Sequence, residues 1–158
     1  MHSRIFQITR KPLVEDDYVT ESLFHDEIFN HVADAVSEET NREEDINWLI
    51  GFLKDKPCTF NPVEKSIIFH PGFKEAYFKS DFEKFKNLTA NMTLESFSSD
   101  GVESLDLYRI IKCINDKFSF YTIDDDYEVQ TLDEFIRTVV KEDSKSKYFL
   151  GGTLDYHF

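Results

Sequence analysis

The sequence predicts an α+β fold: a single domain, residues 1–158, with a mixed or antiparallel sheet and several amphipathic helices. Strand-like runs and helix-like periodicities alternate irregularly, and the strand candidates come in neighbouring pairs, as hairpins do. Hydrophobic residues make up 41% of the chain and aromatic residues 15%, which is enough to build a core. No glycine-rich turn leads from a strand into a helix, and this argues against a dinucleotide-binding parallel sheet.

The chain opens with a strand and continues into an acidic helical block over residues 13–54. Apolar residues on both faces of 3–9 indicate a strand inside the sheet rather than at its edge. Within the block, apolar residues recur at helical spacing over 21–36 and again over 42–54. Asn41 stands three residues before a glutamate, the spacing at which an asparagine caps the start of a helix. The block is therefore predicted to be a pair of helices.

The middle of the chain predicts a hairpin followed by either a kinked helix or two short helices. Apolar runs at 58–60 and 65–70 are separated by an Asn-Pro turn signal, as two antiparallel strands would be. A Pro-Gly pair then interrupts the chain before a segment of helical composition at 73–92. Residues 93–97 fit either a strand or a helical turn.

The last third of the chain predicts two helices and three strands. A helical apolar stripe covers 105–115, and two strand-like runs at 117–123 and 127–130 flank three aspartates that form a turn.

Two signals place the final elements. Thr131 and Glu134 have the spacing of a capping box, and the apolar residues that follow repeat at helical intervals. Residues 148–158 then read as a strand, and the pair Gly151-Gly152 inside it predicts a bulge.

Negative charge is concentrated in one part of the chain. Residues 13–47 hold twelve acidic residues and one base, a net charge of −11, whereas the whole chain carries −13. Such a surface can serve solubility alone. It can also recognise a basic partner, and carboxylates on a rigid face could imitate the phosphate rows of a nucleic acid. An inhibitor of a nucleic-acid-binding enzyme is one specific form of this hypothesis.

The same charge argues against several other partners. A pI near 4.7 disfavours direct binding to nucleic acid or to an anionic membrane. No apolar run approaches the roughly 20 residues that a membrane span needs. The N-terminus lacks the apolar segment of a secretory signal, so we expect a cytoplasmic protein with Cys58 and Cys113 reduced. Cys58, in a loop, is the more reactive candidate of the two.

The candidate partner-binding residues lie in the acidic block. They are acidic side chains and two aromatic side chains that fall beside the apolar stripe of the second helix: Asp16, Asp17, Glu43, Glu44, Trp48 and Phe52. Aromatic residues inside a polar rim are typical of protein-binding hot spots. A broad buried helix face is the alternative reading of Trp48 and Phe52.

A different class of function is open to the first helix of the block. Glu27, His31 and Asp34 are spaced i, i+4, i+7, so they would share one helix face and could ligate zinc or manganese. A small metal-dependent enzyme or metal binder is therefore an alternative, and a structural subunit of an oligomer is another. No catalytic motif or cofactor site is evident, so the sequence favours a non-catalytic protein without a cofactor.

Overall fold

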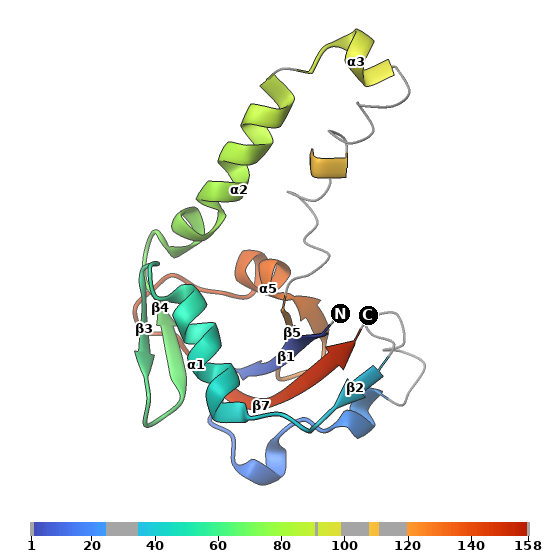
Figure 1. Cartoon of the computed structure of the whole chain (residues 1–158). Helices are drawn as coiled ribbons and strands as arrows, with labels where there is room; N and C mark the ends of the chain where they lie inside the picture. Colours follow the sequence, from blue (N-terminus) through green and yellow to red (C-terminus); the bar gives the residue numbers. More distant parts are fainter. Residues whose placement is uncertain (1, 25–34, 91, 99–107, 111–119, 158) are drawn as a thin grey trace. The chain divides into compact units, whose positions relative to one another are not determined.

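The computed structural model describes residues 2–24, 35–90, 92–98, 108–110 and 120–157 (Figure 1). The chain divides into two compact units. The first consists of residues 1–74 with 118–158, and the second of residues 75–117. In the described part of the chain, no helix is both long enough and apolar enough to cross a membrane.

The first unit is built on a mixed sheet of seven strands among the described residues, which confirms the predicted α+β class. The order is β3-β4-β7-β1-β5-β6, and β2 also pairs with β7. Only the pairing of β1 with β5 is parallel among the strand pairs described. The strands are β1 (His2–Thr9), β2 (Ala35–Ser37), β3 (Cys58–Asn61), β4 (Ser66–Phe69), β5 (Tyr121–Ile123), β6 (Val129–Thr131) and β7 (Lys147–His157).

The helices differ in where they bury side chains. In the first unit, α1 (Arg42–Leu53) and α5 (Leu132–Thr138) bury apolar residues, and two short 3-10 helices, η1 (Glu15–Asp17) and η2 (Glu21–Phe24), precede them. The helix α2 (Phe73–Ala90) begins in the first unit and continues into the second, which also holds α3 (Leu94–Ser98).

Side-chain alternation along β1 separates two packed faces. Asp45 of α1 accepts hydrogen bonds from Arg4 and Thr153, so α1 covers the face that carries Arg4 (Figure 1). The opposite face carries Ile5, which packs in a buried cluster with residues of the segment after β1, Val19 and Phe24 among them. As the sequence predicts, β1 is an interior strand, between β7 and β5.

A bulge in β7 lies at the two glycines, as predicted. Phe6 pairs with Thr153 and Ile8 with Leu150, so two residues of β7, Gly151 and Gly152, face the single residue between them in β1. That residue is Gln7, whose side chain is buried and fills the space that the glycines leave.

The Gln7 amide joins the bulge to the segment that carries η1. Its Oε1 accepts hydrogen bonds from the backbone amides of Gly152 at 2.9 Å and Val19 at 3.1 Å. Its Nε2 donates to the carbonyl of Asp17 at 3.0 Å. All three backbone groups are thereby paired, which matters because an unpaired buried polar group costs about 1–3 kcal/mol.

Arg42 completes the other edge of the bulge. Along one edge of β7, β4 pairs with the first residues of β7 and β2 pairs with the last. The β7 carbonyls between these two pairings have no strand partner on that edge. Arg42 donates from Nε to the Gly151 carbonyl at 2.6 Å and from Nη2 to the Leu150 carbonyl at 2.7 Å. Its guanidinium also lies 4.6 Å from the centroid of the Tyr18 ring. The start of α1 and the end of η1 are therefore held together.

The predicted helix over 21–36 is wrong where the structure describes it. Residues 21–24 form only the 3-10 helix η2, and Ala35–Ser37 forms β2, which pairs with β7. Burial of Phe24 and the backbone pairing of Val36 with Tyr156 outweigh the local helical periodicity. Of the two helices predicted in the acidic block, the second is present as α1. The first does not have the predicted bounds.

Most other predicted elements are confirmed. The hairpins β3–β4 and β5–β6 form, and Asn41 caps α1 by accepting a hydrogen bond from the Glu44 amide. The capping box of α5 is complete. Residues 93–97 become the helical turn α3 rather than a strand. The helix predicted at 105–115 and the first residues of the strand predicted at 117–123 lie largely outside the described residues.

Gly151→Ala should lower the free energy of unfolding by about 1–3 kcal/mol. A Cβ at this position would overlap the Gln7 side chain and lie 2.5 Å from Leu13 Cδ1, so the Gln7 amide would lose its hydrogen-bond geometry. Urea denaturation measures the change.

Gly51→Ala is the matched control, because no atom of the described residues lies within 4 Å of a Cβ at this α1 position. Alanine is favoured over glycine inside a helix by about 1 kcal/mol, so this variant should be more stable than the natural chain. Equal destabilisation by both alanines would contradict the role given to the bulge.

Candidate binding surface

Arg42 and Gln7 tie the two acidic segments, η1 and the first turn of α1, to the bulge in β7. We call the exposed carboxylates of η1 and of the first turn of α1 the acidic surface; its members are Glu15, Asp16, Asp17, Glu43 and Glu44. Gln7 holds the carbonyl end of η1, and Arg42 connects the first residue of α1 to the Tyr18 ring. Four of the six predicted partner-binding residues belong to this surface.

Two carboxylates of this acidic segment, those of Glu43 and Asp45, form ion pairs within the protein. Glu43 accepts a hydrogen bond from Lys65 Nζ at 2.6 Å, and Arg42 Nη1 lies 3.5 Å away. The Lys65 hydrogen bond, together with the positive charges of Lys65 and Arg42, lowers the pKa of Glu43. Asp45, which also counts toward the charge of this segment, is buried against Arg4. Asp45 is therefore hidden from a partner, and the positive charge of Lys65 offsets the negative charge of the exposed Glu43 carboxylate.

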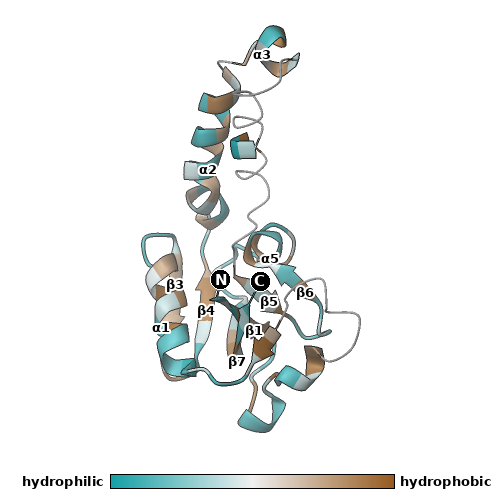
Figure 2. Ribbon diagram, turned by 45° about the vertical axis from the view of Figure 1, so that its right-hand side comes forward, coloured by the Kyte–Doolittle hydropathy of each residue, from teal (hydrophilic) through white to brown (hydrophobic). Residues whose placement is uncertain are grey.

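Four members of the acidic surface are exposed, and their carboxylates form no ion pair with any residue that the structure describes. They are Glu15, Asp16, Asp17 and Glu44. The hydrophilic first turn of α1 is the teal lower end of that helix in Figure 2.

An exposed stripe runs from this surface along α1. Glu44, Trp48 and Phe52 are spaced i, i+4, i+8 and therefore share one side of the helix. Trp48 is 56% exposed and Phe52 46% exposed, so neither belongs to the buried face that Ile46, Leu49 and Leu53 form. The planes of both rings lie nearly perpendicular to that of the Phe120 ring, with centroids 4.4 Å and 5.8 Å from its centroid. The contacts fix the two aromatic rings while leaving much of their surface open.

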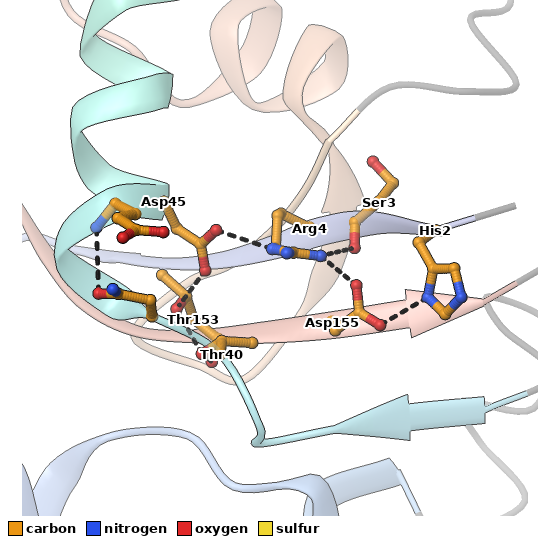
Figure 3. Close-up of polar contacts among 9 residues, drawn as sticks. His2, Ser3, Arg4, Thr40, Asp45, Thr153 and Asp155 are labelled. Carbon is orange, nitrogen blue, oxygen red and sulfur yellow. Dashed lines mark hydrogen bonds and ion pairs between the residues drawn. The ribbon is translucent and has the colours of Figure 1, made fainter.

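A polar network beneath α1 anchors the helix (Figure 3). Arg4 donates from Nε to Asp45 Oδ1 at 2.8 Å and from Nη1 to Asp155, whose other oxygen lies 2.7 Å from His2 Nδ1. Thr153 donates to Asp45 Oδ2 at 3.0 Å. Both oxygens of Asp45 accept hydrogen bonds from β1 and β7, so the network fixes α1 on the sheet. The sequence reading missed it, because a cross-strand pair is not visible in the charge pattern.

Two polar side chains outside the acidic surface, those of His70 and Cys58, form contacts within the protein. His70 lies between the hydroxyl oxygens of Thr59 at 2.6 Å and Ser144 at 2.9 Å. Cys58 hydrogen-bonds to the Leu53 carbonyl, and burial raises the pKa of its thiol, which makes it a poorer nucleophile than a free cysteine. The expectation that Cys58 is a reactive thiol is therefore not supported.

The predicted metal ligands Glu27, His31 and Asp34 lie outside the described residues, so that hypothesis stays a prediction. Among the residues that are described, no group of three or more histidine, cysteine, aspartate or glutamate side chains could hold a metal ion.

Comparisons of the chain with protein-family models, with curated proteins and with solved structures found no match.

Lys65→Met should raise the pKa of Glu43 toward its ordinary value of 4.5, because the hydrogen bond and the positive charge that favour the carboxylate are removed. In the natural chain Glu43 therefore stays ionised as the pH falls to 4.5. The ion pair with Lys65 is lost at lower pH, as the pH falls through the lowered pKa of Glu43. NMR titration of the Glu43 side chain measures the shift.

The equivalent pair of Lys147 and Glu64 supplies the control. Its hydrogen bond lowers the pKa of Glu64 in the same way. Lys147→Met should raise the pKa of Glu64 and leave that of Glu43 unchanged. A Glu43 pKa that does not respond to Lys65→Met would mean that Glu43 belongs with the free carboxylates.

Proposed function

We propose that this chain is a non-catalytic binding protein whose acidic surface docks on the basic surface of a partner protein. Two observations carry the proposal. Glu44 shares the exposed side of α1 with the aromatic stripe, and the contact of Arg42 with the Tyr18 ring ties the start of that helix to η1. The carboxylates of η1 and of Glu44 form no ion pair with a described residue. Charge accelerates encounter and selects the sign of the partner, whereas buried aromatic rings supply most of the free energy of a typical interface.

Two further features support a preformed binding surface. The rings of Trp48 and Phe52 are held against Phe120, and the backbone beneath the carboxylates is fixed by Gln7 and Arg42. Ordering these groups before binding reduces the entropy lost on association. A partner that normally binds nucleic acid would have a suitable basic surface, and inhibition by imitation of phosphate charge is the finer form of the proposal.

Reversal of Asp16, Asp17 and Glu44 to lysine should raise the Kd for a purified partner at least about tenfold at low salt, and less at high salt. The partner is first recovered on the immobilised natural chain, and its affinity is then measured by calorimetry. The three substitutions change the net charge from −13 to −7, since each adds two positive charges.

The matched control reverses Glu83, Glu95 and Asp126, which are exposed, lie outside the acidic surface and form no ion pair with a described residue. It produces the same net charge and should keep at least half of the affinity. Equal weakening by both sets would show that net charge alone governs capture, and no weakening by the first set would reject the acidic surface.

A further inference from the structure

We infer that the exposed stripe on α1 is a binding site for an arginine side chain of the partner, here called the arginine site. The guanidinium stacks on Trp48 and pairs with Glu44. The inference rests on the proposed function and makes it specific, because it names the residue that the basic partner presents. It joins three observations: an exposed tryptophan, an unpaired carboxylate one helical turn before it, and an open position beside both.

Trp48 offers the best aromatic surface for a cation. The planes of the Trp48 and Phe120 rings meet at 81°, and Trp48 remains 56% exposed. Tryptophan binds cations more strongly than tyrosine or phenylalanine does. Glu44 lies four residues earlier on the same side of the helix, so a guanidinium over the indole can reach its carboxylate.

Gly51 leaves room for the rest of the arginine side chain. It sits three residues after Trp48 and next to Phe52, on the exposed side of α1, and a Cβ there would meet no atom of the described residues within 4 Å. Glycine inside a helix costs about 1 kcal/mol relative to alanine, and no packing contact among the described residues requires it. The open position allows the methylene groups of a partner side chain to lie against the helix backbone.

The chain already places a cation on the neighbouring ring. Lys56 Nζ lies 5.0 Å from the Phe52 centroid, within the range of a cation–π contact. This intramolecular contact occupies Phe52 and leaves the partner to engage Trp48.

The geometry favours arginine over lysine. A guanidinium is planar, so it can stack on the indole while its N–H groups donate to a carboxylate with two parallel hydrogen bonds. An ammonium group is a compact and strongly hydrated charge that gains less from stacking. The distinction separates this inference from simple attraction between opposite charges.

Trp48 is the single tryptophan of the chain, so its fluorescence reports on this site alone. We would titrate the full chain with a capped tetra-arginine peptide and, separately, with a capped tetra-lysine peptide of equal charge. The arginine peptide should change Trp48 emission in a saturable way and bind at least about fivefold tighter than the lysine peptide. Calorimetry gives the two affinities independently of the fluorescence.

Two variants test the placement. Gly51→Gln fills the open position with an uncharged side chain, and Trp48→Leu removes the ring; each should abolish the preference for arginine in calorimetry. The control Glu95→Gln removes one exposed negative charge in the second unit and should leave the preference intact. Thermal unfolding confirms that all variants are folded.

Equal affinity for the two peptides, or an arginine preference that survives in Gly51→Gln and Trp48→Leu, would overturn the inference. The proposed function would then still stand if reversal of Asp16 and Asp17, which are not part of the arginine site, weakened partner binding. If that reversal has no effect on the partner while the arginine preference is present, the arginine site exists but the carboxylates of η1 do not take part in docking.

Discussion

The buried amide of Gln7 is the constraint on which the rest of the first unit depends. A single side chain satisfies the backbone of a bulge in β7 and the backbone on both sides of Tyr18, at Asp17 and Val19. Position 151 requires glycine, because a Cβ there would overlap the amide. Arg42 completes the arrangement from the other edge of the same bulge. The sheet, the 3-10 helix η1 and the start of α1 thus share one junction.

Ion pairs within the first unit determine which carboxylates of the acidic segment remain available to a partner. Net charge computed over residues 13–47 overstates what a partner would meet, because Asp45 is buried with Arg4, and Lys65 neutralises Glu43. Of the remaining carboxylates, that of Glu44 shares the exposed side of α1 with Trp48 and Phe52. The contact of Arg42 with Tyr18 ties η1 to the start of the same helix, although Asp16 and Trp48 are about 30 residues apart in the sequence.

Local signals predicted the elements that depend on local chemistry. The capping residues Asn41 and Thr131, the hairpin around residues 58–70 and the double-glycine bulge all follow from short-range rules. The helix predicted over 21–36 was wrong because Phe24 and Val36 respond to distant strands, and periodicity contains no information about them. For the same reason the sequence identified Trp48 and Phe52 as candidates but could not reveal Phe120 beneath them or Arg4 beneath Asp45.

Amide hydrogen exchange tests the central claim most directly. Val19 and Gly152 both donate to Gln7 Oε1, although they belong to segments far apart in the chain. In Gln7→Leu, exchange at both amides should accelerate together by at least about tenfold, whereas the His70 amide, which donates to the Pro57 carbonyl, should keep its rate. Retained protection at either Val19 or Gly152 in Gln7→Leu would contradict the junction and the surface that rests on it.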